Sequence, residues 1–371
     1  MQASPLRYAW HAKSYGADKA SIRLRVLEPM RVLRERGLDV GFYCEATGPA
    51  AYAAIIFSKS FAPNALCIAR EARSRGRAVI FDISDNLFAG PLALRRKDGK
   101  LARLSEMMAL ATHVTVPTSV LAAQITEAVP EVQDKVRIIP DALDGIPDPS
   151  SGLPTRRERH RLDGLRRFLD RHRDALHCVW FGKSQGNVSG IAHLDAAVGQ
   201  LELFSRRHPV TLTVISNKRW RYWKACWGWS LPTHYLPWTL NSFHEALALH
   251  RVAVIPVEKN GYTVGKSINR PATAILAGLG VVADAIPSYE ELRPFIALDN
   301  WQGGLQRYLD CSPGKDPALE AARERLQQLY GPREVACLWE RLLLETVEPA
   351  AQGEPPVRSD CWAPLASLVA R

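Results

Sequence analysis

Short apolar runs alternate with longer amphipathic stretches along most of the chain, from about Ser21 to Tyr330. The runs are rich in alanine, valine, isoleucine and phenylalanine, as in Ala53–Phe57 (AAIIF) and Ala78–Asp82 (AVIFD). Such runs are typical of strands that are buried on both faces of a parallel sheet. Because helical patterns separate them, the sequence predicts an α/β fold with parallel sheets.

The pattern occurs on both sides of a stretch rich in proline, glycine and serine, between Gly145 and Pro154. A stretch of this composition is typical of a linker, and 371 residues suit two domains better than one core. We therefore predict two doubly wound, Rossmann-like domains that face a central cleft. Their expected limits are residues 1–145 and 176–332, with a basic linker or helix at 146–175 and a tail at 333–371 that could pack back on the first domain.

One local unit predicts an anion site. The apolar run Val252–Val257 leads into a glycine-containing loop, the polar cluster Lys266–Arg270, and a short helical pattern that starts at Pro271 and stops at Gly278. Proline favours the first helical turn, and glycine favours the position just after the last one. Anionic ligands bind at such helix N-termini, beyond the carboxyl ends of parallel strands. The cluster therefore predicts phosphate binding, although a solvated loop before a helix would also suit these residues.

Bulk composition adds a preference for an anionic partner. The net charge is +10 and the pI is near 9.4, which favours a nucleotide, a nucleic acid or an acidic membrane face. Apolar runs are too short to span a bilayer, the first residues lack a signal-peptide core, and the seven cysteines form no metal-binding or CxxC spacing. We expect a cytoplasmic protein with reduced thiols, which could bind the inner face of the membrane peripherally.

Two clusters bear on that membrane hypothesis. Eight arginines and three acids lie between Arg156 and Arg173, which is typical of a solvated helix or, alternatively, of a basic membrane-facing stretch. Four tryptophans lie between Trp220 and Trp229. Packing of the tryptophans beneath a loop is the simpler interpretation, and a stacking platform or an interfacial aromatic belt is the alternative.

Several segments, in their order and spacing, resemble a known family. They are SIRLRVLEPMRVLRERGLDV, THVTVPTSVLAAQI with KVRIIPDALD, VWFGKSQGNVSGIAHL, LPWTLNSFHEALALHRVAVIPV and GKSINRPATAILAGLGVVADAIPSYEEL. Together they look like the GT-B glycosyltransferases, most like the family 4 group that uses nucleotide-sugar donors. The resemblance implies an N-terminal acceptor-binding domain and a C-terminal donor-binding domain.

The resemblance also implies roles for individual residues. Gly182 and Lys183, at the end of a predicted strand, correspond to the place of a cation on the donor diphosphate. Lys266 and Arg270 would hold that diphosphate from the other side, and Trp238 would lie beside the nucleotide base, unless it is a core residue. Ser267 and Asn269 could donate hydrogen bonds. The diphosphate would then be neutralised without a metal or other cofactor.

Some positions depart from the family pattern. The family usually has paired glutamates around the donor loop, whereas Gly265 and Thr273 stand at these places here. Glu258 lies just upstream and could substitute for the first of them. The departures leave open whether the reaction retains or inverts the anomeric configuration, although the resemblance favours retention.

The first half of the chain contributes the expected acceptor side. Asp82 and Asp85 follow a predicted strand, so one of them could accept the proton of the acceptor hydroxyl or bind sugar hydroxyls; a turn or helix cap is the structural alternative. Arg23 and Arg25, expected on a loop before the first helix, could touch phosphate or an anionic acceptor, or simply be solvated.

These observations predict a glycosyltransferase that moves a sugar from a UDP- or GDP-sugar to a saccharide or lipid-linked acceptor, in the assembly of surface glycans. Two alternatives are a nucleotide-sugar epimerase of the same fold and a non-catalytic homologue that binds nucleotide sugars or glycans. The missing glutamates favour the non-catalytic homologue, and the cations Lys266 and Arg270 count against it. Nucleic-acid binding rests on charge alone and lacks any recognition motif.

Overall fold

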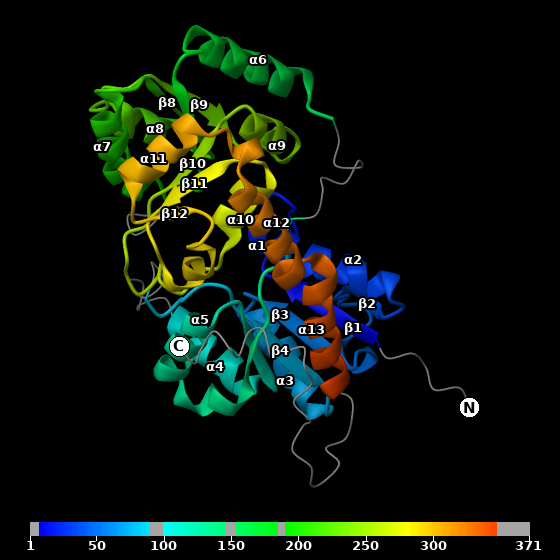
Figure 1. The fold of residues 1–371 in the computed structure, drawn as a ribbon. Helices are drawn as coiled ribbons and strands as arrows, with labels where there is room; N and C mark the ends of the chain where they lie inside the picture. The colour runs from blue at the N-terminus through cyan, green and yellow to red at the C-terminus, as the bar shows by residue number, and fades with distance from the viewer. Residues whose placement is uncertain (1–6, 90–98, 145–152, 185–189, 347–371) are drawn as a thin grey trace.

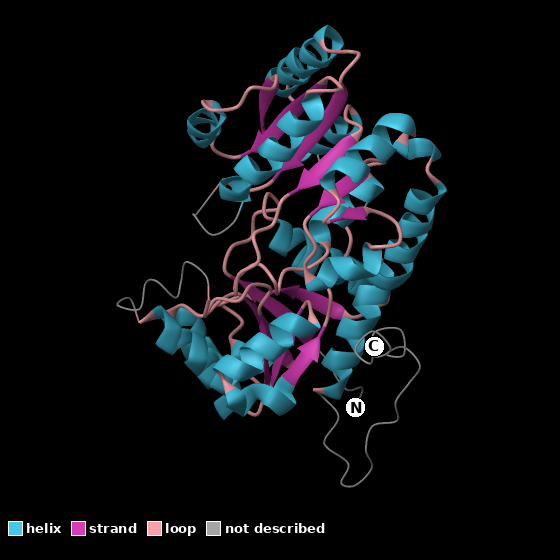
Figure 2. Ribbon diagram, turned by 60° about the vertical axis from the view of Figure 1, so that its left-hand side comes forward, coloured by secondary structure: helices cyan, strands magenta, loops and turns pink. Residues whose placement is uncertain are grey.

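The computed structural model describes residues 7–89, 99–144, 153–184 and 190–346. It contains two six-stranded sheets, in which every pairing is parallel, and helices cover both sheets (Figures 1 and 2). The predicted α/β fold with two doubly wound sheets is confirmed. In the described ranges, no helix combines the length and the apolar character needed to cross a membrane.

The first sheet lies in the N-terminal half and has the strand order β2-β1-β3-β4-β5-β6. Its strands are β1 (Arg7–Ala12), β2 (Asp39–Phe42), β3 (Ala54–Ser58), β4 (Ala78–Asp82), β5 (His113–Val116) and β6 (Val136–Ile138). The connecting helical segments are α1 (Ala20–Ile22), the π-helical η1 (Arg23–Leu27), α2 (Glu28–Glu35), α3 (Pro63–Ser74), α4 (Lys100–Leu110) and α5 (Ser119–Ala128).

The second sheet has the order β12-β11-β10-β7-β8-β9. Its strands are β7 (Leu176–Phe181), β8 (Val210–Ser216), β9 (Thr233–Pro237), β10 (Val252–Ile255), β11 (Gly280–Ala283) and β12 (Ala297–Leu298). The helices of this half are α6 (Arg156–Arg171), α7 (Leu194–Ser205), α8 (Arg219–Cys226), α9 (Leu240–Ala248), α10 (Asn269–Leu276), α11 (Trp301–Asp310) and α12 (Pro317–Tyr330).

Alternating side chains of the central strands supply two cores to the first sheet. Ile55 and Phe57 pack toward α3, α4 and α5, whereas Ala54 and Ile56 pack toward α2 and the last described helix, α13 (Pro332–Glu345). The indoles of Trp10 and Trp339, 5.6 Å apart, join α13 to this second core. Figure 1 shows α13 beside α2, at the far end of α12 from the second sheet. The C-terminal helix therefore packs on the first sheet; the rest of the tail, residues 347–371, lies outside the described residues.

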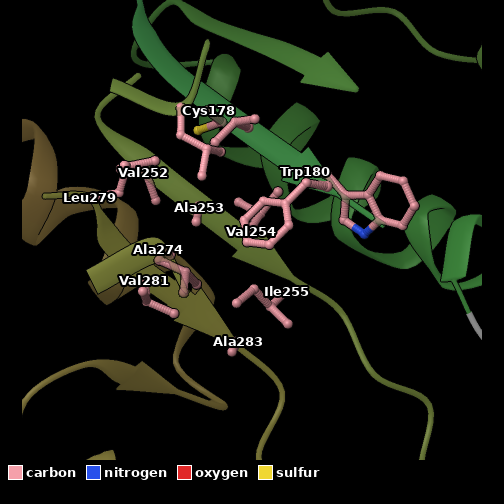
Figure 3. Packing of buried hydrophobic residues seen from close by; sticks show 14 of the residues in the cluster. Cys178, Trp180, Val252, Ala253, Val254, Ile255, Ala274, Leu279, Val281 and Ala283 are labelled. Carbon is pink, nitrogen blue, oxygen red and sulfur yellow. The ribbon is translucent and has the colours of Figure 1, made fainter. Parts of the chain in front are cut away.

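The core of the second sheet determines which residue can stand at the start of β11. Strands β10 and β11 are fully buried, and Figure 3 shows their valines, alanines and isoleucine packed beside Cys178 and Trp180. The ring of Tyr308, on α11, lies so close to Gly280 that a Cβ there would meet it at 2.5 Å. Glycine is thus required at this position by packing.

Three elements differ from the sequence predictions. β1 was not predicted, because RYAWHA mixes cationic and aromatic residues instead of forming an apolar run. The stretch expected as a loop from Ser21 is helical, and η1 carries both Arg23 and Arg25. Helix α8 forms from the tryptophan-rich stretch, which no periodicity identifies as a helix.

Burial of His250 predicts a pH-dependent stability. Its Nδ1 lies 2.8 Å from the carbonyl of Ala246 and its Nε2 lies 2.7 Å from Oγ1 of Thr213. Burial lowers the pKa of His250 to about 4, so the neutral ring is stabilising above the unfolded pKa of about 6.5, and this stability is lost as pH falls toward 4. From pH 7 to 5, this histidine should reduce the free energy of unfolding by about 2 kcal/mol.

Urea unfolding of the wild type and of His250→Gln at both pH values checks this expectation. The variant should lose about that share of the pH dependence, whereas His160→Gln, on the exposed face of α6, should not. An equal pH dependence in the wild type and His250→Gln would contradict the assignment.

Candidate functional site

A cavity of about 550 Å³ lies between the two sheets. Its walls include residues that follow the carboxyl ends of β4, β7 and β10, together with the start of α10. This is the edge at which open parallel sheets bind ligands. Of the predicted site residues, it brings together Arg23, Asp85, Gly182, Lys183, Trp238, Lys266, Ser267, Asn269 and Arg270. It does not include Arg25, Asp82 or Glu258.

The wall formed by the second sheet carries a cation at the N-terminus of α10. The guanidinium of Arg270 lies 5.9 Å from the ring centroid of Trp180. A Cβ on Gly182 would come within 2.9 Å of Arg270 Nη2 and 3.1 Å of that indole. Gly182 therefore acts by leaving room for Arg270 at the end of β7. With its free N–H groups and positive dipole, this helix start suits an anionic group.

Lys183 adds positive charge from the end of β7. Burial, and then the nearby ammonium of Lys59, lower the pKa of Lys183. An anion bound in the cavity would reverse this effect by pairing with the ammonium group. Lys183 is thus placed in the cavity as the sequence predicted, with a local field that favours an anionic ligand.

A partly buried ion pair joins Asp85 of the first half to Lys266 of the second half across the cavity. The carboxylate of Asp85 accepts hydrogen bonds from Lys266 and also from Lys59, and the Lys266 ammonium lies 4.0 Å from the ring centroid of Tyr262. Burial alone would raise the pKa of Asp85, but the two ammonium groups outweigh it and hold the pKa far below its usual range. Asp85 is therefore ionised and neutralises Lys266, which was predicted to bind the donor diphosphate. The sequence analysis had placed Asp85 on the acceptor side only.

This pair predicts the behaviour of Asp85→Asn. An anionic ligand on Lys266 has to compete with the Asp85 carboxylate, so its removal should strengthen nucleoside-diphosphate binding about tenfold, the equivalent of a hydrogen bond to a charged group of about 1.5 kcal/mol. Isothermal titration of both proteins with the same nucleotide checks this. Weaker binding in a folded Asp85→Asn protein would show that the carboxylate supports the ligand site instead of competing for it.

Asp141 is a site residue that the sequence analysis missed. Its carboxylate is buried and accepts hydrogen bonds from Ser267 Oγ at 2.7 Å, from Asn269 Nδ2 at 2.5 Å, and from Arg25 Nη1 at 2.8 Å. It lies three residues after the end of β6, in the segment IIPDALD, so its position after a strand was a usable signal. The polar groups of Ser267 and Asn269 thus face a first-half carboxylate across the cavity.

The structure corrects the interpretation of Asp82 and Arg25. Both are about 1% exposed, and Asp82 accepts hydrogen bonds from Arg25 Nε, Ser58 Oγ and Thr115 Oγ1, each at 2.8 Å. The two carboxylates outweigh burial and raise the pKa of Arg25. Asp82 has no access to a substrate, and Arg25 is neither solvated nor available to phosphate. Both belong to a buried network in which Arg25 donates to Asp82 and to Asp141.

Arg23 remains at the cavity and covers the predicted base site. It forms a paired contact with Asp144 (Nε to Oδ1 at 2.9 Å and Nη2 to Oδ2 at 3.0 Å). Its guanidinium lies 5.7 Å from the ring centroid of Trp238, which in turn lies 5.9 Å from Phe243. Trp238 is half-buried with one side toward the cavity, so an aromatic base would meet both an indole and a cation there.

Glu258 is placed differently from the prediction, and His193 takes a position beside it. The Glu258 side chain is 73% exposed and does not line the cavity. Its backbone N–H donates to His193 Nδ1 at 3.2 Å, and His193 does line the cavity. The sequence analysis did not single out His193, which lies in the segment GIAHL, directly after the glycine-bearing loop of the second half.

No group of three or more histidine, cysteine, aspartate or glutamate side chains within the ranges that the structure describes could hold a metal ion. The ionised groups at the cavity are instead paired lysines, arginines and carboxylates, as for Lys59, Asp85 and Lys266.

Comparison with solved structures identifies the fold. The α,α-trehalose 6-phosphate synthase of Burkholderia multivorans is similar over 99% of both chains, with 12% identity and a TM-score of 0.61. The trehalose-6-phosphate enzyme from E. coli, bound with UDP-2-fluoro glucose, matches over 91% of this chain and 92% of its own, with 11% identity and a TM-score of 0.53. TarM of S. aureus, in a complex containing UDP, matches over 78% of this chain and 55% of its own, with 12% identity and a TM-score of 0.50.

No family model matches the sequence, and no curated protein is significantly similar to it. The similarity to solved structures establishes the fold alone. The fold is GT-B, with two parallel α/β domains and a cavity between them. The predicted resemblance to GT-B proteins is confirmed at that level.

Proposed function

We propose that the protein is a glycosyltransferase that uses a nucleoside-diphosphate sugar, a UDP- or GDP-sugar, as its donor. One observation carries this proposal: Lys183, Lys266 and Arg270 all line a cavity that is large enough for a nucleotide sugar, and Arg270 lies in the first turn of α10. A cavity of this size is typical of small-molecule sites. The GT-B fold, and the UDP and UDP-2-fluoro glucose bound in two structural neighbours, support the same donor class.

In the proposed complex, the diphosphate lies on the N–H groups at the start of α10. Arg270 and Lys266 bind it from one side and Lys183 from the other, so that the charge of the leaving group is neutralised by side chains, without a metal. The base lies beside Trp238. When the diphosphate binds, Lys266 exchanges its bond to Asp85 for one to phosphate. The Asp85 carboxylate then keeps only its bond to Lys59.

The acceptor occupies the side of the cavity formed by the first sheet. We propose a saccharide or lipid-linked acceptor, transfer with retention, and a role in surface-glycan assembly at the cytoplasmic face of a membrane. Asp85, once its bond to Lys266 is broken, is a first-half carboxylate at the cavity that could bind acceptor hydroxyls or accept a proton. Asp82 has no part in this proposal, because it is buried.

A second candidate function is a non-catalytic protein that binds nucleotide sugars. The observation in its favour is Thr273, which lines the cavity at the place where the family usually has a glutamate. A threonine can donate or accept a hydrogen bond, but it cannot carry the negative charge of a carboxylate. Donor binding and sugar transfer therefore have to be measured separately.

The test is release of nucleoside diphosphate from UDP- and GDP-sugars, each incubated with the purified protein, with and without a mixture of saccharide and lipid-linked acceptors. The transferase predicts acceptor-stimulated release of UDP or GDP, which Arg270→Ala abolishes. Saturable donor binding with no release from any donor would support the non-catalytic alternative. Neither binding nor release would contradict both.

A further inference from the structure

Two tryptophans of the short helix α8, and a third directly after it, are exposed to solvent. Trp220, Trp223 and the adjoining Trp227 are 57%, 56% and 94% exposed. The opposite side of α8 is fixed: Tyr222 lies 5.3 Å from the ring of Tyr235 and its hydroxyl lies 2.8 Å from Thr233 Oγ1, both on β9. The simpler sequence interpretation, packing beneath a loop, is therefore wrong for these three indoles. Exposed indoles gathered on one element indicate an interaction surface.

Cations accompany the indoles. The segment from Lys218 to Trp229 contains four basic residues and no acidic one. The guanidinium of Arg219 lies 4.8 Å from the ring centroid of Trp223, and that of Arg221 lies 5.0 Å from that of Trp220. Two acidic side chains of α7 contact the end of this segment: Asp195 accepts from the indole of Trp229, and Glu202 accepts from Ser230. The exposed indoles are thus bordered by positive charge.

The arginine-rich helix α6 flanks the same edge strand. Phe168 of α6 stacks on His234 of β9, with ring centroids 5.2 Å apart, whereas α8 packs on the neighbouring residue Tyr235. Successive side chains of a strand point to opposite faces, so the two helices cover opposite faces of β9. Arg171 of α6 and Arg219 of α8 both lie close enough to lower the pKa of His234, after the larger effect of burial. Figure 1 shows both helices in the half that contains the second sheet.

We propose that α8, assisted by the exposed arginines of α6, docks the protein on an anionic lipid bilayer. Tryptophan favours the water–bilayer interface, because its ring is apolar and its N–H is polar. Lysine and arginine beside such rings are attracted to anionic headgroups. The absence of acidic residues from the Lys218–Trp229 segment and the net charge of +10 favour this partner over an uncharged glycan. The surface shares no residue with the cavity, so it can be tested apart from donor binding.

The test is flotation of the full chain with vesicles of phosphatidylcholine alone or mixed equally with phosphatidylglycerol, at low salt and at 1 M salt. We expect flotation only with the anionic vesicles and release at high salt, since the Debye length falls from about 10 Å at 0.1 M to about 3 Å at 1 M. Replacing Trp220, Trp223 and Trp227 together by serine should abolish flotation. Changing Arg219 and Lys224 to glutamine should weaken vesicle binding by roughly fivefold for each charge removed.

Matched controls are Leu203→Ser and Leu344→Ser, which remove exposed apolar side chains from α7 and α13 and should leave flotation unchanged. Circular dichroism and binding of nucleoside diphosphate establish that each variant is folded. Three outcomes would overturn the proposal: no flotation of the wild type, equal flotation of the tryptophan variant, or tryptophan-dependent self-association in solution without vesicle binding. The last result would assign the surface to a second copy of the chain.

Discussion

Arg25→Leu should lower the free energy of unfolding by about 3–5 kcal/mol. The guanidinium is fully buried and is shared by the carboxylates of Asp82 and Asp141. Leucine would leave both carboxylates without that partner, in a site that water does not reach. Most of the loss is therefore the cost of unpaired buried charge rather than the strength of the original pair.

Urea unfolding followed by circular dichroism measures this effect. The matched control is Arg31→Leu on α2, whose guanidinium is about half exposed and pairs with Glu28 and Glu35 at the surface. We expect the control to change stability by no more than about 1 kcal/mol. If Arg25→Leu were as mild as its control, the buried network would not hold this side of the cavity together.

Lys266→Ala should weaken the binding of a nucleoside diphosphate by roughly 1.5–3 kcal/mol, the range for hydrogen bonds to charged groups. The side chain reaches the cavity and is the second-half partner of Asp85. Titration calorimetry measures the change, and Lys259→Ala is the matched control, because Lys259 is exposed in the same connection after β10. Unchanged affinity in Lys266→Ala would remove this lysine from the donor site.

The double substitution of Lys266 by alanine and Asp85 by asparagine separates the two roles of the pair. Lys59 then has no carboxylate partner at Asp85, and the ligand no longer competes with one. If Asp85 acts only as a competitor, the gain from Asp85→Asn should disappear when Lys266 is absent. If the gain persists, the carboxylate acts on the ligand through Lys59 or Lys183 instead.

The fold was predictable because the central strands are plain apolar runs. Ala78–Asp82 and Val252–Ile255 are buried on both faces, so their sequences carry the signal of a parallel sheet directly. Segments that mix polar or charged residues with apolar ones carry no such signal. β1 includes an arginine and a histidine, and α8 has aromatic residues on its exposed as well as its packed side. Their structure depends on contacts with distant residues, which local periodicity does not report.

Site residues were predictable where the local sequence determines their position, and not where they depend on distant partners. The cluster from Lys266 to Arg270 lies at the cavity because a strand–loop–helix unit determines its place locally. Asp82 and Asp85 are only three residues apart, yet the first is the last residue of β4 and is turned into a buried network, whereas the second reaches the cavity. Asp141 and Arg25 meet across 116 positions of sequence, and such a partnership leaves no local trace.

The central claim is that the cavity binds the diphosphate of a nucleotide through Lys266 and Arg270. Calorimetric titration of the wild-type protein with UDP and GDP, and with uridine and guanosine, tests it most directly. We expect one of the two diphosphates to bind, its nucleoside to bind at least about tenfold more weakly because the charge-assisted hydrogen bonds are missing, and the double alanine variant of Lys266 and Arg270 to lose this preference. Failure of both diphosphates to bind the wild type, or an unchanged preference in the double variant, would contradict the account.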